Sequence, residues 1–129
     1  MHRLSTLFLL VVFLVIVSGC VNLDLSSTDE ESLESLREAG SDFSQIHPFD
    51  FYLYHPEEEG AANICKELAM KGFQITVREG ALGGEWLCLA SFNMLPSIEK
   101  LTQLELQIEG IIGVHGGEYD GWETIVIVQ

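Results

Sequence analysis

Two helical hydrophobic stripes, each set between strand-like segments, constrain the fold of this chain more than any other feature. Apolar side chains recur every three or four positions in residues 56–71 and again in residues 96–112, as they do along the buried face of a helix. Other segments alternate with period two or are almost continuously apolar, which is typical of strands: residues 46–55, 73–78, 85–93 and 119–128. The predicted order of elements is therefore β-α-β-β-α-β.

This order predicts how the elements pack. Each β-α-β unit is expected to cross over with right-handed chirality, which places both helices on one face of an antiparallel sheet. Residues 79–84 are rich in glycine and predict a hairpin between the second and third strands. We expect an α+β, ferredoxin-like sandwich, a fold that serves many unrelated functions.

The N-terminus has the three parts of a secretory signal. Arg3 lies near the start, residues 7–17 are eleven uninterrupted apolar residues, and Val-Ser-Gly-Cys follows at 17–20. A cysteine after Ser-Gly resembles the bacterial lipoprotein box, in which that cysteine is lipidated and becomes the mature N-terminus. We predict a signal peptide at 1–19, a lipid on Cys20 and a domain held in the cell envelope, outside the cytoplasm. The alternative is an uncleaved membrane anchor over residues 4–21.

Acidic and serine residues dominate the segment that follows. Residues 21–45 contain seven acids and six serines, and their large apolar residues are few and scattered. Such a composition buries too little surface to offset the entropy of ordering. We therefore predict an acidic, flexible tether over residues 20–45 and a folded domain over residues 46–129.

The charge of the chain narrows the choice of partner. Six basic and 20 acidic residues give a net charge of −14. Binding to nucleic acid needs a Lys/Arg footprint, so direct binding to nucleic acid is not expected. A basic protein surface or a cation suits this charge better.

Five stretches of the expected domain resemble one bacterial family. They are residues 49–54 (FDFYLY), 72–73 (GF), 86–91 (WLCLAS), 94–97 (MLPS) and 117–123 (GEYDGWE). Together they are similar to the regulator of ribonuclease E activity B family, over essentially the whole of residues 46–128. The resemblance implies a ferredoxin-like α+β domain without catalysis of its own, which binds ribonuclease E as a protein inhibitor. Family inhibitors are cytoplasmic, as is their target, whereas this chain carries an export signal.

The last of these stretches is the candidate partner-binding site. Tyr and Trp beside a polar rim are typical anchors of protein interfaces. The other interpretation is that the rings complete the core while the carboxylates bond neighbouring backbone. Strict alternation divides the motif between two faces, unless the strand bulges at Gly121. The candidate residues are Glu118, Tyr119, Asp120, Trp122 and Glu123.

Histidines and cysteines suggest two further sites. His47, His55 and His115 invite a metal hypothesis, but the first two lie at opposite ends of one strand, so we expect exposed histidines and no metal. Cys65 and Cys88 lie on the helical stripe and in the apolar strand, where a disulfide is geometrically possible. We favour reduced core cysteines, because the cytoplasmic family that the domain resembles needs no bridge.

The sequence contains no nucleophile elbow, phosphate loop or CxxC motif. We therefore predict no enzyme activity and no cofactor. The leading prediction is a membrane-anchored lipoprotein whose domain binds and regulates another protein. The alternatives are a ribonuclease E regulator that faces the cytoplasm and an envelope protein that binds a small ligand or metal.

Overall fold

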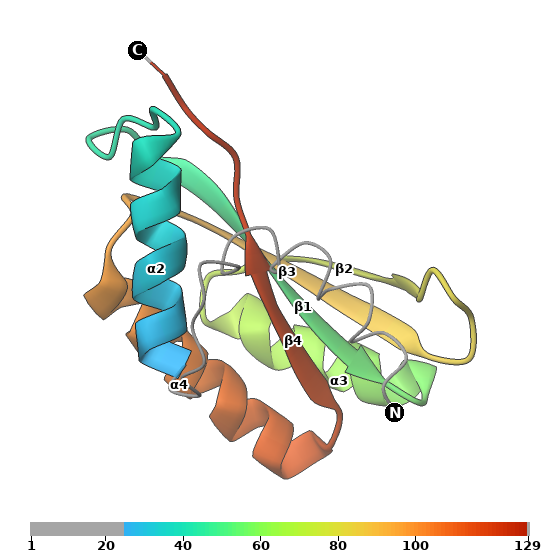
Figure 1. Ribbon diagram of the computed structural model, residues 1–129. Helices are drawn as coiled ribbons and strands as arrows, with labels where there is room; N and C mark the ends of the chain where they lie inside the picture. Colours follow the sequence, from blue (N-terminus) through green and yellow to red (C-terminus); the bar gives the residue numbers. More distant parts are fainter. Residues whose placement is uncertain (1–24, 129) are drawn as a thin grey trace.

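The computed structural model describes residues 25–128, which form three helices and one four-stranded sheet (Figure 1). The predicted signal peptide and Cys20 lie outside these residues. The elements run in the order α2 (Leu25–Glu38), β1 (His47–His55), α3 (Glu58–Met70), β2 (Gln74–Glu79), β3 (Trp86–Met94), α4 (Ile98–His115) and β4 (Glu118–Glu123).

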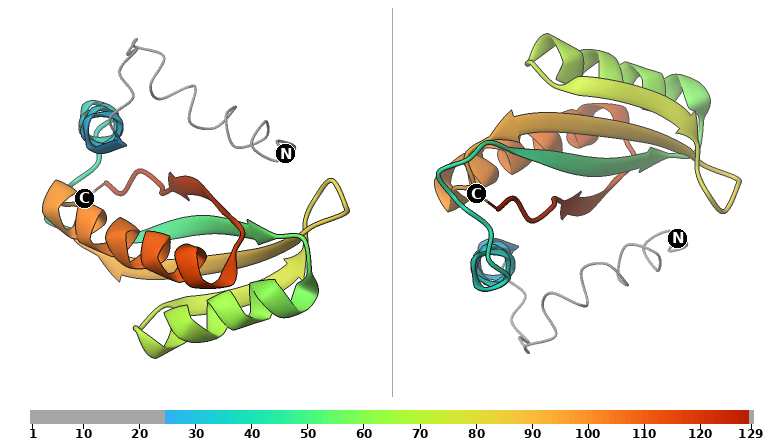
Figure 2. Two further views of the ribbon diagram at one scale, coloured as in Figure 1. Left: turned by 90° about the horizontal axis from the view of Figure 1, so that it is seen from below. Right: turned by 90° about the horizontal axis from the view of Figure 1, so that it is seen from above.

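The sheet has the order β2-β3-β1-β4, and each neighbouring pair of strands is antiparallel. Both α3 and α4 cover the same face of this sheet (Figure 2). The predicted ferredoxin-like α+β sandwich is thus confirmed. Ser97 caps the start of α4 by accepting a hydrogen bond from the Lys100 backbone N–H at 3.1 Å.

The core forms between the sheet and these two helices. Phe49, Phe51 and Leu53 of β1 point to this face and are fully buried. The stripe of α3 packs against them and is equally buried, through Ala61, Ile64, Cys65 and Leu68. The period-two and helical patterns that predicted β1 and α3 therefore describe one shared hydrophobic interior.

A disulfide joins Cys65 of α3 to Cys88 of β3, with 5.7 Å between the two Cα atoms. Our preference for reduced cysteines is wrong in this structure. The preference was based on a resemblance to a cytoplasmic family that folds without a disulfide. The two cysteines, however, lie where a helix and a strand face each other across the core.

The predicted flexible tether is also wrong for most of its length. Residues 25–38 form α2, a helix that packs beside α4 (Figure 1). Leu33 is only 7% exposed and belongs to the main core, and Leu36 and Phe43 pack against that core. The apolar residues are few, as the composition indicated, but these three contact the core of the domain, and composition alone could not predict that contact.

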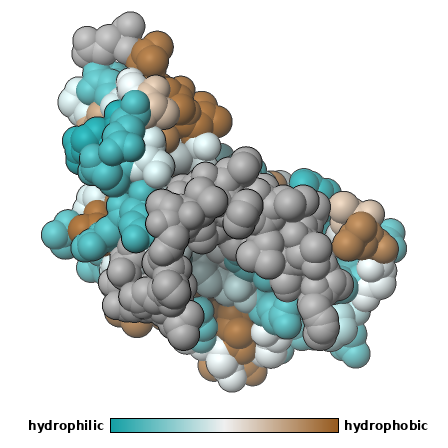
Figure 3. Space-filling model, in the orientation of Figure 1, coloured by the Kyte–Doolittle hydropathy of each residue, from teal (hydrophilic) through white to brown (hydrophobic). Residues whose placement is uncertain are grey.

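The final strand is shorter than predicted. β4 ends at Glu123, and residues 124–128 continue without strand pairing. Ser41 and Asp42 hold this segment: the Asp42 N–H donates to the Ile127 carbonyl oxygen at 2.7 Å, and the Ile127 N–H donates to Ser41 Oγ at 2.9 Å. Its apolar side chains stay open to solvent, with Ile125 56% and Val128 67% exposed. Figure 3 shows apolar surface at the corresponding place near the C-terminus.

Candidate functional site

An irregularity in β4 decides where the motif of residues 117–123 points. Tyr119 pairs with Leu53, Gly121 pairs with Tyr52, and the register shifts between these two pairs. Asp120 is therefore the extra residue of a β-bulge, beside Gly121 with its positive φ of 111°. Because the bulge adds one residue, Tyr119 and Trp122 lie on the same face of the sheet.

That face is the inner one, so the two rings belong to the interior. The Tyr119 ring lies 6.4 Å from that of Phe51, and the Trp122 ring lies 5.3 Å from that of Phe49, measured between centroids. Both pack against the main hydrophobic core. Of our two interpretations of these rings, the core one describes the structure.

The polar atoms of the two rings are bound beneath α2. The Trp122 indole N–H donates to Asp29 Oδ1 at 3.0 Å, and the Tyr119 hydroxyl donates to Glu105 Oε2 at 2.5 Å. Asp29 and Glu105 are only 5% and 7% exposed. β4, α2 and α4 therefore meet at one buried polar cluster, formed by Asp29, Glu105, Tyr119 and Trp122.

The environment of the cluster changes the protonation of Glu105. Burial, a hydrogen bond with Asp29 and the charge of Asp29 raise the pKa of Glu105 to about 9. Burial and the charge of Glu105 hold the pKa of Tyr119 well above its usual value. With its pKa raised to about 9, Glu105 is protonated near neutral pH and can donate a hydrogen bond to Asp29. This contact joins α4 to α2.

The other members of the motif face elsewhere. Glu123 accepts a hydrogen bond from the Tyr52 hydroxyl at 2.6 Å on the outer face of the sheet, where burial raises the pKa of Tyr52. Glu118 is exposed at the start of β4, and Asp120 is half-buried in the bulge. The five residues do not form one continuous patch. Asp29 and Glu105 are the cluster members that sequence analysis missed, since neither position has a local signal beyond its charge.

The three histidines make structural contacts, and our expectation that all are exposed is wrong for His47. His47 is fully buried: its Nδ1 donates to the Gln45 carbonyl oxygen at 2.8 Å, and its Nε2 lies 2.6 Å from Ser41 Oγ.

His55 Nε2 donates to the His115 carbonyl oxygen at 3.1 Å, and His115 Nε2 lies 2.5 Å from Glu67 Oε2. His47 and His55 stand at opposite ends of β1, as predicted. Within residues 25–128 no group of three or more His, Cys, Asp or Glu side chains is arranged to hold a metal ion.

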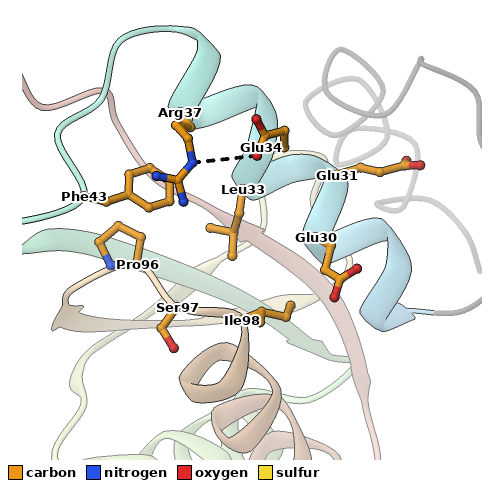
Figure 4. A pocket seen from close by; sticks show the side chains of 9 residues that line it. All are labelled: Glu30, Glu31, Leu33, Glu34, Arg37, Phe43, Pro96, Ser97 and Ile98. Carbon is orange, nitrogen blue, oxygen red and sulfur yellow. Dashed lines mark ion pairs between the residues drawn. The ribbon is translucent and has the colours of Figure 1, made fainter.

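A groove lies between α2 and the start of α4, with a volume of about 520 Å³ (Figure 4). One wall is the face of α2 that carries Glu30, Leu33 and Arg37, and the other is the loop and first turn at Pro96 and Ile98. The groove is thus open to solvent and depends on α2 being docked. Sequence analysis could not find it, because one of its walls was predicted to be a flexible tether.

The fold and these sites define a class: a small α+β protein whose prominent surface features are an acidic helix and an open groove. A family model described as "Regulator of ribonuclease activity B" matches residues 26–124, and the chain belongs to this family. The match begins within α2, which agrees with that helix being part of the domain.

A curated relative is similar over most of both chains. It is the "Regulator of ribonuclease activity B" of Actinobacillus succinogenes, 22% identical over 105 residues, which span 78% of this chain and 74% of that protein. The family consists of regulators of an enzyme. The membership therefore supports a regulatory, protein-binding role. None of the helices in the described part of the chain is both long and apolar enough to span a membrane.

Proposed function

We propose that this chain is a bacterial lipoprotein, anchored in the cell envelope through Cys20, whose domain binds and regulates another protein without catalysis or a cofactor. Membership in a family of ribonuclease regulators supports the regulatory, protein-binding part of this proposal. The lipoprotein box at 17–20 supports the anchor.

The observation that carries the location is the Cys65–Cys88 disulfide. Disulfides persist in oxidising compartments and are rare in the cytoplasm, where thiols are kept reduced. An apolar N-terminal segment ending in Ser-Gly-Cys and a disulfide in the core are independent features, and both favour a domain outside the cytoplasm. Under this proposal the first residue of α2 follows Cys20 after only four residues, so the domain sits close to the membrane surface.

A second candidate function is direct regulation of a ribonuclease by a domain that faces the cytoplasm. The family match favours it. The two candidates differ in compartment, and this difference makes them separable by one experiment.

The test compares the wild-type chain with Cys20→Ala by lipid labelling, fractionation and protease treatment of intact spheroplasts. The proposal predicts that the wild type carries label and is cleaved from outside, while Cys20→Ala loses the label. An unlabelled wild-type chain that is protected from external protease would overturn it and leave the cytoplasmic regulator as the better account. Cross-linking in cells, followed by identification of the bound protein, then tests the regulatory part.

A further inference from the structure

We propose that the groove between α2 and the start of α4 is the docking site for a basic segment of the partner protein, which inserts aliphatic side chains between flanking Lys or Arg residues. This inference rests on the proposed function, because it assigns a surface and a ligand chemistry to the protein partner. It replaces Tyr119 and Trp122 as the anchors, since both rings are occupied in the interior.

The floor of the groove is apolar, which is the first requirement for such a site. Leu33, Phe43, Pro96 and Ile98 line it, and they come from α2, from the loop after α2 and from the entry to α4. In Figure 4 the Leu33 side chain points from α2 toward Ile98, and Phe43 lies beside Pro96. A hollow of this size and lining accommodates one or two aliphatic side chains, because burying them there removes apolar surface of both partners from water.

The rim of the groove is acidic, which sets the charge of the ligand. Glu30 and Glu34 are exposed on α2 at the edge of the hollow, whereas the nearby Glu31 side chain points away from Pro96 and Ile98 (Figure 4). Among the described residues that line the groove, Arg37 is the one basic residue; it stands 3.7 Å from Glu34 and lies over the Phe43 ring at 4.1 Å from its centroid. Its charge is therefore directed at these two neighbours, and the rim remains net negative. An acidic rim around an apolar floor complements Lys or Arg residues flanking a hydrophobic anchor.

The same charges exclude other occupants. A second copy of this chain also carries a net charge of −14 with six basic residues in all, so two copies repel each other. Nucleic acid carries the same sign of charge as the rim. A basic protein segment remains, docked in the way that an amphipathic helix enters a groove.

The experiment uses the full chain in nanodiscs of zwitterionic lipid, with empty nanodiscs as the blank. The probe is a synthetic peptide of about 12 residues with two leucines one helical turn apart, flanked by lysines, and carrying a fluorophore and a photoreactive benzophenone. Two comparison peptides replace the leucines by alanine or the lysines by glutamine. The groove predicts binding of the first peptide, about fivefold or greater loss with either replacement, and weakening with added salt.

Variants of the protein test whether the peptide binds in the groove. Glu30→Gln/Glu34→Gln removes two rim charges and is expected to weaken binding about fivefold, while the matched control Glu57→Gln/Glu79→Gln removes two exposed charges elsewhere and leaves it within about twofold. Ile98→Ala enlarges the floor and weakens binding of the leucine peptide more than that of the alanine peptide. Circular dichroism checks that each variant remains folded.

Mass spectrometry of the photo-cross-linked complex decides the site. Cross-links within residues 30–43 and 95–98 support the inference. Cross-links to the outer face of the sheet, equal loss in the rim variant and its control, or no binding at all would overturn the groove. Capture of a partner in cells together with cross-links elsewhere would contradict the groove as the docking site and leave the proposed function standing. Groove binding by a chain that carries no lipid would support the groove and contradict the proposed lipoprotein anchor.

Discussion

Two helices of this protein are held to the domain by different kinds of contact, one mainly apolar and covalent and the other mainly polar. α3 lies on the sheet with a stripe of fully buried apolar residues and a covalent bond to β3. α2 packs beside α4; among its residues 28–38, Leu33 is the one buried apolar side chain, and Asp29 contacts Trp122 and Glu105. α3 is held by apolar packing and a disulfide. α2 is held largely by buried polar contacts, which depend on the protonation of Glu105.

The difference matters because α2 forms one wall of the groove. Conditions that loosen α2 are expected to remove the groove while leaving the sheet and α3 folded, since stability varies between cooperative units of one domain. We therefore expect the two helices to respond separately to substitution, and the following predictions test that separation.

The largest effect is expected from removing the disulfide. Replacing both Cys65 and Cys88 by alanine frees a loop between residues 23 positions apart, which lowers the free energy of unfolding by about 3 kcal/mol. Chemical denaturation of the wild type and the double variant measures the loss, and reductant should lower the stability of the wild type alone. A double variant as stable as the wild type would show that α3 is held by packing only.

Leu33→Ala is expected to lower the stability by about 2 kcal/mol, because it leaves a cavity where α2 meets the core. Hydrogen exchange should rise in residues 28–38 before it rises in α3. Leu106→Ala on α4 is the matched control, since this leucine is 69% exposed and its loss should change little. Equal and simultaneous exchange in α2 and α3 would contradict the idea that α2 is a separate unit.

The buried cluster predicts a pH dependence of stability. The folded-state pKa of Glu105, about 9, lies above its ordinary value of 4.5, so the stability it contributes is fully present below pH 4.5 and is lost as the pH rises toward 9. Glu105→Gln keeps an acceptor for the Tyr119 hydroxyl and adds a donor for Asp29. It should flatten the decline between pH 5 and pH 8 by on the order of 1 kcal/mol.

The control for this prediction is Glu79→Gln, which removes an exposed carboxylate on β2, at the opposite edge of the sheet from β4. Thermal unfolding at several pH values compares the three proteins. An unchanged slope in Glu105→Gln, or an equal flattening in Glu79→Gln, would show that overall charge rather than the buried Glu105 sets the dependence.

The smallest effect is expected at the outer edge of α2. Arg37→Ala removes an exposed ion pair with Glu34 and the contact over the Phe43 ring, which together contribute about 0.5 kcal/mol. Urea denaturation at low and high salt measures this difference. A loss above about 2 kcal/mol would mean that α2 is held mainly by its rim rather than by the buried cluster.

The contrast between the helices also explains what could be predicted from the sequence. α3 and the strands have strong periodic patterns, because each buries a whole face, and their order predicted the sheet topology. α2 buries Leu33 and an aspartate, so its pattern resembles that of a solvated acidic segment. The pairing of Asp29 with Glu105 and Trp122 is a tertiary property, joining residues 76 and 93 positions apart along the chain.

The motif at β4 was predicted in part. Its aromatic residues indicated either an interface or a core, and their alternation alone could not decide. The bulge at Asp120 reverses the side on which Tyr119 would otherwise lie relative to Trp122 and brings both rings inside. A bulge depends on the partner strand as well as on Gly121, so local sequence does not determine it.

The most direct test of the central claim, that this domain works outside the cytoplasm, is the redox state of Cys65 and Cys88 in living cells. Cells expressing the full chain are quenched with acid and treated with a thiol-reactive mass tag, with and without prior reduction. An exported domain predicts no tag on these two cysteines until reductant is added. Tagging of both cysteines without reduction would contradict export, and it would restore direct cytoplasmic regulation of a ribonuclease as the better account.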